Sequence, residues 1–235
     1  MSPIAPVRVN AAFRSSVNNE AYIFMNNGQY VLLDYAPGTT DDKILNGPYP
    51  ISVAFQSLKG TPFGEHGIEC AFDTDRNEAY IFSGNLCAYI YYAPHSSDDK
   101  ILRGPMSIPD MFPCLKGTVF EKRIDAAFRS SVSNEAYIFT GDQYARINYA
   151  SISVSYPKTI KNEWPCLAGT IFESGIEAAF ASHITNEAYL FKGEQYARIK
   201  FTPGKNEDYL MGGVRPILSY WPGLGGLLAS KNSTN

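Results

Sequence analysis

The chain has 235 residues, a mass of 26.0 kDa and a net charge of −3 at neutral pH. Its Lys and Arg residues are scattered, and the lack of a basic stripe argues against nucleic-acid binding. No apolar run in the sequence is long enough to cross a membrane. The first residues, Met-Ser-Pro-Ile-Ala-Pro, lack the charged and apolar regions of a secretory signal, so we expect the protein in the cytosol.

One tetrapeptide, Asn-Glu-Ala-Tyr, occurs four times at nearly equal spacing. A fixed period of this size is the sequence signature of a repeat architecture, in which one structural unit is built several times. We therefore expect four units of similar structure. The copies begin at Asn19, Asn77, Asn134 and Asn186.

Each unit opens with an apolar pentapeptide a short distance before the tetrapeptide. Residues such as Ile, Val and Phe followed by polar turn residues indicate a short β-strand. The small residues in its middle imply that other backbone segments approach closely on both faces. The four pentapeptides are Val9–Phe13, Ile68–Phe72, Ile124–Phe128 and Ile176–Phe180.

The tetrapeptide begins a second strand, in which small and aromatic residues alternate as in Glu-Ala-Tyr-Ile-Phe. The turns after it are rich in Gly and Asn, which is typical of connections between antiparallel strands. A third strand alternates in the same way, for example over 144–149 and 196–201. Because the tetrapeptide Glu recurs in every unit, we expect it to make structural hydrogen bonds across blades or to turn amides.

The end of each unit changes to a helical period, with apolar residues at positions i, i+4 and i+7. Neighbouring Pro and Gly limit this helix to a turn or two. We expect a fourth, outermost strand between the helix and the next pentapeptide. The apolar positions are Ile51, Phe55 and Leu58, then Ile108, Phe112 and Leu115, then Ile160, Trp164 and Leu167, and finally Ile217, Trp221 and Leu224.

Three or four antiparallel strands in each of four units favour an all-β fold, a four-bladed β-propeller with a short helical turn at the end of each blade. An all-β sandwich is the alternative, but it does not explain why whole units recur at one period. The predicted propeller spans 1–228, with blades at about 9–67, 68–123, 124–175 and 176–228, and a polar tail follows at 229–235.

The four cysteines do not predict a disulfide framework. Cys114 and Cys166 occupy the same place in successive repeats, and equivalent places in different blades are too far apart to bond. Cys70 and Cys87 stand where other repeats have Ala and Tyr, which indicates buried apolar residues. We find no nucleophile elbow, zinc motif or phosphate loop, so we expect a binding scaffold and not an enzyme.

Longer segments carry a recognisable pattern. Ile124–Phe128 and Tyr156–Ile160, followed by Trp164–Leu167, resemble the hemopexin repeat, and the resemblance extends from Val9 to about Leu228. The Asn-Glu-Ala-Tyr version of the repeat and the four-blade length are similar to the legume seed albumin-2 family. The resemblance implies a cytosolic seed albumin that forms homodimers, carries ions along a central channel and is linked to polyamine and heme binding.

Ring closure departs from the wider hemopexin pattern. Hemopexin-type domains usually join the first and last blades by a disulfide, and this chain has no cysteine before Cys70 or after Cys166. We therefore expect a noncovalent closure, in which the segment 217–228 packs against the start of the first blade.

The pentapeptide is expected to be the innermost strand of each blade. An innermost strand is a sheet edge, so half of its backbone groups lack a strand partner. Four such edges around one channel form rings of carbonyl oxygens and amides that need ions or water. A hard cation accepts a shell of oxygen ligands of this kind. A channel that holds only water is the alternative.

The resemblance implies which carbonyl groups bind ions. The carbonyl of the second pentapeptide residue binds Ca²⁺, the carbonyl of the fourth binds a second, weaker ion such as Na⁺, and the amides between them hold Cl⁻. These residues are Asn10, Glu69, Asp125 and Glu177 for Ca²⁺, and Ala12, Ala71, Ala127 and Ala179 for the second ion.

Two ligand sites outside the channel are predicted as well. The carboxylates of Glu69, Asp125 and Glu177 would give one channel mouth a negative potential, which suits a polyamine such as spermine. The alternative is that these carboxylates only support the ion or pair with Lys and Arg. Heme needs an axial ligand or an apolar slot, and His66, just before an inner strand, is the candidate ligand. A solvated loop histidine is the alternative there.

Two main functions follow from these observations. One is a ligand-binding albumin, and the other is a nutrient reservoir that stores nitrogen and sulfur; a protein–protein interaction module is a third. The first two units carry an insertion, at 36–43 and 93–100, which makes one half of the ring differ from the other. Such an asymmetric rim could supply the twofold interface of a homodimer.

Overall fold

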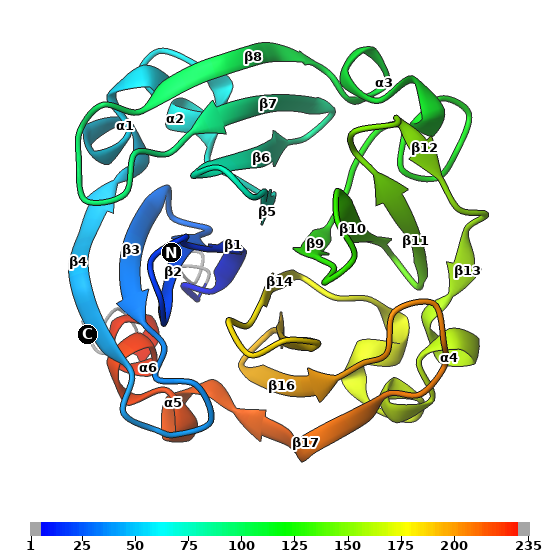
Figure 1. The fold of residues 1–235 in the computed structure, drawn as a ribbon. Coiled ribbons are helices and arrows are strands. Elements are labelled where there is room, and N and C mark those ends of the chain that lie inside the picture. Colours follow the sequence, from blue (N-terminus) through cyan, green and yellow to red (C-terminus); the bar gives the residue numbers. More distant parts are fainter. Residues whose placement is uncertain (1–5, 230–235) are drawn as a thin grey trace, which may run out of the picture.

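The computed structural model describes residues 6–229, which form four antiparallel sheets arranged as a ring (Figure 1). In a β-propeller the axis of such a ring is its central channel. Each sheet is one blade, and the strands follow one another in chain order from the channel to the rim. This confirms the predicted four-bladed propeller and excludes the sandwich. Within 6–229, no helix is both long and apolar enough to span a membrane. The predicted tail lies outside the described residues except for Ala229, which ends a helix.

The first two blades each contain four strands and then short helical segments. The first consists of β1 (Val9–Arg14), β2 (Glu20–Met25), β3 (Gln29–Asp34), β4 (Lys43–Pro50), α1 (Ile51–Ala54), η1 (Gln56–Leu58) and α2 (Pro62–His66). The second consists of β5 (Cys70–Asp73), β6 (Glu78–Ser83), β7 (Leu86–Tyr91), β8 (Lys100–Ser107), α3 (Ile108–Met111) and η2 (Pro113–Leu115).

The third blade differs from the others because its outermost strand is split into two short pieces. It consists of β9 (Ala126–Arg129), β10 (Glu135–Thr140), β11 (Gln143–Asn148), β12 (Ser153–Val154), β13 (Lys158–Thr159), α4 (Ile160–Glu163), η3 (Pro165–Leu167) and η4 (Ile171–Ser174). The fourth consists of β14 (Ala178–Ala181), β15 (Glu187–Lys192), β16 (Gln195–Lys200), β17 (Tyr209–Pro216), α5 (Ile217–Tyr220) and α6 (Pro222–Ala229).

The asparagine of the tetrapeptide has a structural role in every blade. Its φ lies between 58° and 64°, the left-handed region that Asn tolerates better than most residues. Its carbonyl accepts the amide of the aromatic residue that follows the third strand, at 2.9–3.0 Å. The aromatic partners, in blade order, are Tyr35, Tyr92, Tyr149 and Phe201.

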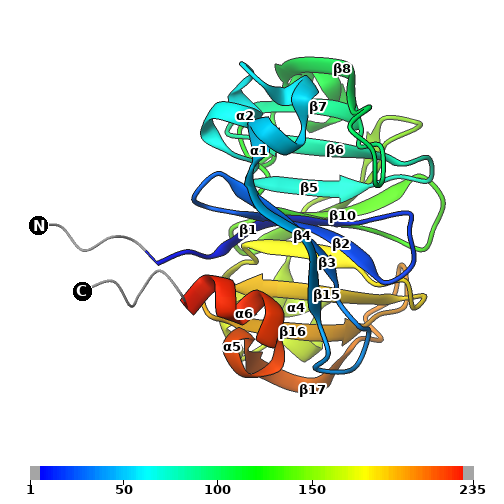
Figure 2. The same cartoon turned by 90° about the vertical axis from the view of Figure 1, so that its left-hand side faces the viewer.

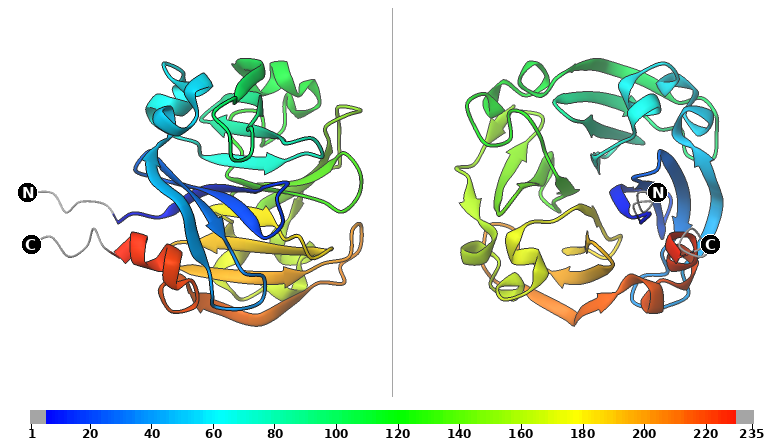
Figure 3. Two further views of the ribbon diagram at one scale, coloured as in Figure 1. Left: turned by 60° about the vertical axis from the view of Figure 1, so that its left-hand side comes forward. Right: turned by 180° about the vertical axis from the view of Figure 1, so that it is seen from behind.

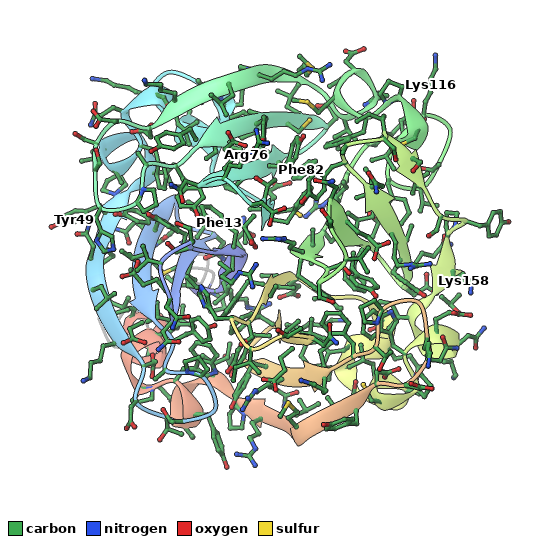
Figure 4. All side chains as sticks on the ribbon, viewed as in Figure 1. Phe13, Tyr49, Arg76, Phe82, Lys116 and Lys158 are labelled. Atoms are coloured by element: carbon green, nitrogen blue, oxygen red, sulfur yellow. The ribbon has the colours of Figure 1, made fainter. Side chains whose placement is uncertain are left out.

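The core lies between blades, and each hydrophobic cluster takes its residues from two neighbouring blades. Phe13 of β1, for example, is fully buried and stacks on Tyr22 of its own blade at 4.8 Å between ring centroids. Its ring also lies 5.0 Å from that of Tyr92, which belongs to the second blade. Figure 4 shows side chains filling the spaces between the sheets, with Phe13 and Phe82 inside the ring. One blade alone would leave one of these faces exposed.

The predicted place of the outermost strand is wrong. β4, β8 and β17 come before the helical segment of their blades, whereas the residues after it form further helical turns such as α2 and η4. The outermost strand escaped prediction because it packs on one side only, and most residues of β4 are exposed. A strand in this position has little hydrophobic alternation to detect.

The predicted division of the ring into two unlike halves is also wrong. The loop that precedes the outermost strand in the first two blades has a counterpart at 202–208 in the fourth blade, and only the third blade departs from the pattern. In three blades this loop ends in an aspartate that accepts amide hydrogen bonds from the helical segment of the preceding blade. The pairs are Asp99 with Gln56 and Ser57, Asp208 with Cys166, and Asp42 with Gly223 and Leu224.

The ring closes where the fourth blade meets the first, and the closure is noncovalent as predicted. All four cysteines are free. Ile217, Trp221 and Leu224 are buried in one cluster with Val9 and residues of β2 and β3. α6 lies beside β4, and it ends on the same side of the ring on which β1 begins (Figure 2, Figure 3). The Asp42 carboxylate accepts the amides of Gly223 and Leu224 at 3.2 and 2.9 Å.

A second contact at this closure involves a histidine. Nε2 of His183 in the fourth blade donates to the Ser15 carbonyl of the first blade at 3.0 Å. Its Nδ1 accepts the amide of Asn19 at 3.2 Å and lies 2.7 Å from the Tyr35 hydroxyl. Both ring nitrogens are therefore used by the neutral imidazole. Burial, followed by the nearby Arg14 guanidinium, lowers the pKa of His183 below its usual 6.5.

Replacing Asp42 by Ala should weaken the closure of the ring. Two amides of the helical segment 222–229 lose their acceptor, which should lower the free energy of unfolding by about 1–2 kcal/mol. The neighbouring Asp41 is exposed, and Asp41→Ala should change stability by at most about 0.5 kcal/mol. Urea unfolding of both variants measures this difference, and equal effects of the two substitutions would contradict the role assigned to Asp42.

Mild acid should also weaken the closure. Because the folded state lowers the pKa of His183, the unfolded chain binds the proton more readily, and the stabilisation present above pH 6.5 is lost as the pH falls through the lower, folded pKa. The contribution of one such proton to the slope is at most about 1.4 kcal/mol per pH unit. Unfolding free energies between pH 7.5 and 5 should fall more steeply for the wild type than for His183→Gln, with exposed His66→Gln as the control. Parallel curves for wild type and His183→Gln would remove His183 from the explanation.

Candidate functional site

The innermost strands β1, β5, β9 and β14 surround the channel and have a strand partner on one side only (Figure 1). In each blade the amide of the second residue after the pentapeptide bonds to the carbonyl of the tetrapeptide Glu, which fixes the register of the pair. In an antiparallel pair such bonded residues alternate with residues whose N–H and C=O groups point away from the partner. By this alternation, the outward-pointing positions include Ala12, Ala71, Ala127 and Ala179.

The second pentapeptide residue interrupts this alternation. On β1, Val9 faces Met25 and Ala11 faces Phe24, so Asn10 is an extra residue in a β-bulge. In the other three blades the amide of the second residue donates to the same Phe that pairs with the third residue. These amides belong to Glu69, Asp125 and Glu177, with N···O distances of 2.8–3.0 Å.

The bulge has a consequence for the channel. The amide of the third residue points to its strand partner, and in a trans peptide the preceding carbonyl points the opposite way, towards the channel. The amide of the second residue is turned inwards to the blade, so its carbonyl faces the channel without an accompanying donor. The level of Asn10, Glu69, Asp125 and Glu177 is therefore a ring of acceptors only. The level of Ala12, Ala71, Ala127 and Ala179 presents amides and carbonyls together.

The side chains at the acceptor ring form the acidic mouth of the channel, which consists of Glu69, Asp125 and Glu177. Each carboxylate accepts the amide of the turn glycine in its own blade at 2.8–3.0 Å. The three side chains line a cavity of about 420 Å³ together with Arg8, Arg123 and Lys192. Arg123 Nε lies 2.7 Å from Asp125 Oδ1. The turn amides and Arg123 thus already partner part of this negative charge.

The opposite end of the inner strands carries an arginine cap, formed by Arg14, Asp73 and Arg129. Arg14 Nη2 lies 3.0 Å and Arg129 Nη1 3.7 Å from the same Asp73 oxygen, Oδ2. Arg14 Nη1 also donates to the Ser182 carbonyl at 2.8 Å. Arg14, Asp73 and Arg129 come from the first, second and third blades, and the bond to Ser182 adds the fourth. The cap therefore links all four blades at this end of the channel.

The cap was not predicted from the sequence. Its residues directly follow the Phe of the pentapeptide in the first three repeats, where the fourth has Ala181. The mixture of Arg, Asp, Arg and Ala at one repeat position was the available signal. The Asp73 side chain is only 4% exposed, and its Oδ1 has no hydrogen-bond partner among the described residues.

The three histidines lie in different places. His66 is exposed at the end of α2 and is not among the residues that line the acidic-mouth cavity. His183 lies at the closure of the ring, and His95 contacts Glu20 of the first blade. The structure therefore brings none of them to the carbonyl rings. Among residues 6–229, no group of three or more His, Cys, Asp and Glu side chains could hold a metal ion, so a channel ion would depend on backbone oxygens.

These features define a hemopexin-type propeller, and comparisons with known proteins agree. The Hemopexin family model matches residues 124–167 and 176–226. Albumin-2 of Pisum sativum is 57% identical over 226 residues, which cover 95% of this chain and 97% of the relative. The chain therefore belongs to the albumin-2 family of seed albumins.

Solved structures give the same result. A plant albumin from Cicer arietinum, described as showing hemagglutination, is 57% identical with a TM-score of 0.92, covering 95% of this chain and 99% of that one. A plant lectin with two metal binding sites, also from Cicer arietinum, is 59% identical with a TM-score of 0.92, covering 94% and 99%.

Removing the charge of Asp73 should destabilise the propeller strongly. Asp73→Asn leaves two partly buried guanidinium groups without their shared counter-charge, which should lower the free energy of unfolding by about 3 kcal/mol. Asp75 also pairs with Arg129, but its side chain is 49% exposed, so Asp75→Asn should cost at most about 1 kcal/mol. Chemical denaturation distinguishes the two, and a cap of no structural importance would show equal, small losses.

Proposed function

We propose that this chain is a seed albumin whose central channel binds Ca²⁺. The ligands are the backbone carbonyl oxygens of Asn10, Glu69, Asp125 and Glu177. Two observations support this: the bulge at Asn10, and the amides of Glu69, Asp125 and Glu177 that bond inside their blades. By the geometry of the peptide, the carbonyls at this level then face the channel. A ring that offers acceptors without donors suits a hard cation. The carboxylates of the acidic mouth add negative potential at the same level.

The next level of the channel presents amides and carbonyls together and suits a different pair of ions. The amides of Ala12, Ala71, Ala127 and Ala179 follow the acceptor ring and are suited to Cl⁻, and the carbonyls of the same residues are suited to a second cation such as Na⁺. Alternating rings of donors and acceptors allow neighbouring ions of opposite charge. The description of the Cicer lectin, which has two metal binding sites, supports this proposal.

A bound cation would join the four blades at the end opposite the arginine cap. The role proposed for the protein is therefore binding rather than catalysis, in keeping with relatives that are named albumins and lectins. A nutrient reservoir is compatible with the same molecule, since storage makes no demand on the channel. A cytosolic location and a homodimer remain predictions.

The ligands predicted outside the channel have unequal support. The acidic mouth retains three carboxylates beside a cavity, which favours a polyamine such as spermine, although Arg123 already pairs with Asp125 and lies 4.0 Å from Glu69. Heme at His66 has less support, because the side chain is exposed and not among those lining the acidic-mouth cavity. Both remain predictions.

A second candidate function is glycan binding. The two Cicer proteins described as a lectin and as showing hemagglutination are 59% and 57% identical to this chain. We propose that the present chain shares this property, and the channel ions would then stabilise the scaffold that presents the glycan site.

Purified protein should contain Ca²⁺, and removing it should lower the melting temperature. Elemental analysis detects the metal, and thermal melting with and without a chelator measures its contribution, which grows with the logarithm of the free ion concentration. The double variant Glu69→Gln/Asp125→Asn keeps the carbonyl ring but loses two charges, so it should bind Ca²⁺ several-fold more weakly. Asp75→Asn, at the other end of the channel, should bind Ca²⁺ like the wild type.

The result that contradicts the calcium proposal is a metal-free protein with an unchanged melting temperature after chelation. The same variants test the polyamine prediction by calorimetry at low salt. Spermine should bind the wild type and bind the double variant more weakly. Binding that is equal in both would show that the acidic mouth is not the polyamine site.

A further inference from the structure

A pocket of about 710 Å³ lies in the rim between the first and second blades. This rim pocket is lined by the aromatic residues Tyr22, Tyr30, Tyr49, Phe55 and Tyr92, and by His95 from the loop that precedes β8. Its volume falls within the range of about 300–1,000 Å³ typical of small-molecule sites. No other function described above uses these residues.

A comparison of the repeats explains why the pocket is open at this place. Leu32 on β3 pairs with Tyr22, whereas Arg146 and Arg198 pair with the equivalent tyrosines in the third and fourth blades. Those arginines hold the tetrapeptide glutamates of their own blades, as in the 2.6 Å contact between Arg198 Nη2 and Glu187 Oε2. Leu32 has no charged group with which to hold Glu20. The first blade therefore lacks the guanidinium that occupies this space in the third and fourth blades.

The loop of the next blade compensates for the missing arginine. Opposite Arg198 and Arg146 this loop has Gly38 and Gly204, and a Cβ on Gly38 would lie 2.7 Å from Arg198 Nη1. Opposite Leu32 the same loop position is His95, which adopts φ 57° in place of a glycine. His95 Nε2 lies 3.0 Å from both carboxylate oxygens of Glu20. Where the third strand of a blade carries this arginine, the facing loop therefore has glycine. Where the third strand carries Leu32, the facing loop has His95.

The corresponding pocket at the fourth blade is partly filled by the protein's own arginine side chains. Arg198 lies over the Tyr189 ring at 5.9 Å and Arg215 over the Tyr220 ring at 4.4 Å. The cavity there is about 330 Å³, less than half the volume of the rim pocket. The two sites therefore share an architecture but differ in whether the protein's own side chains occupy it.

The lining of the rim pocket combines aromatic rings with hydrogen-bonding groups, and its His95 contacts Glu20. None of the described residues that line it is Lys, Arg, Asp or Glu. Asn46 Nδ2 donates to the Tyr30 hydroxyl at 3.1 Å, and Ser96 and Ser97 add hydroxyl groups. Tyr49 is 47% exposed and lies at the outer edge of the ring (Figure 4). The pocket lining thus contains both aromatic rings and hydrogen-bonding groups.

We infer that the rim pocket binds a neutral sugar unit of a glycan, an inference that rests on the proposed glycan binding. A pyranose has one apolar C–H face, which stacks on an aromatic ring, and hydroxyl groups at its edge, which bond to Asn, Ser, His and Tyr. Tyrosine supplies both kinds of contact at low entropic cost. A polyamine is disfavoured here because the Glu20 carboxylate already has its partner.

The test measures sugar binding to the wild type and to two pocket variants. Leu32→Arg/His95→Gly rebuilds the fourth-blade arrangement, so an arginine should fill the pocket and hold Glu20. Tyr49→Ala removes only an exposed ring. Tyr209→Ala is the control, because Tyr209 is 56% exposed on β17 and does not line the pocket. A printed glycan array identifies a bound sugar, and calorimetry with its methyl glycoside gives affinities.

The double variant should lose at least tenfold in affinity, Tyr49→Ala several-fold, and Tyr209→Ala less than twofold, with melting curves confirming that each is folded. If the double variant does not fold, the affinity of Tyr49→Ala for the sugar alone tests whether the rim pocket is the site. Wild-type binding that neither pocket variant reduces would overturn the location and leave glycan binding intact. A wild type that binds nothing on the array would overturn glycan binding itself and, with it, this site.

Discussion

The structure depends on one constraint, the unpaired backbone edge of each innermost strand. Four such edges meet around one axis, and their amides and carbonyls cannot bond to each other as strands in a sheet do. Buried backbone groups without partners are costly. The bulge at the second pentapeptide residue makes the two ends of the channel different, because it leaves a ring of carbonyls without donors at one end. At the other end, Arg14 and Arg129 converge on Asp73 and reach across to the fourth blade.

The repeated residues and the departures from repetition have different roles. Residues found in every blade, such as the left-handed tetrapeptide Asn, build the blade itself. Residues that differ between the repeats lie where one blade contacts another or where a pocket is open. Asp42 and His183 hold the closure of the ring, and Leu32 with His95 leaves the rim pocket open. In a molecule built from similar units, these asymmetric positions are the natural candidates for function.

Much of the fold could be predicted from the sequence because the same pattern of residues occurs in four copies, which can be compared with one another. The inner strand, the tetrapeptide strand and the helical turn each have a strong period, and all were found. The outermost strand was misplaced because most residues of β4 are exposed and do not alternate. The matching loop of the fourth blade was missed because its residues 205–207 differ from those of the first two blades, although its final Asp208 has the role of Asp42 and Asp99.

Contacts between blades were harder to predict than the blades. The arginine cap joins residues from separate repeats. The sequence of one repeat does not indicate that its charged side chain meets an opposite charge from another repeat across the channel. The tetrapeptide glutamates were expected to bond across blades or to turn amides. Within residues 6–229, the Glu20 side chain contacts another blade through His95, whereas Glu78, Glu135 and Glu187 bond to Tyr89, Arg146 and Arg198 of their own blades.

The central claim is that donor-free carbonyls from the four inner strands create a cation seat on the channel axis, and diffraction can locate that seat. Crystals of protein in which Mn²⁺ or a lanthanide replaces Ca²⁺ would show the ion by its anomalous scattering. The account predicts a peak on the axis at the level of Asn10, Glu69, Asp125 and Glu177. A channel with no anomalous peak, or a peak bound only by side chains elsewhere on the surface, would contradict it.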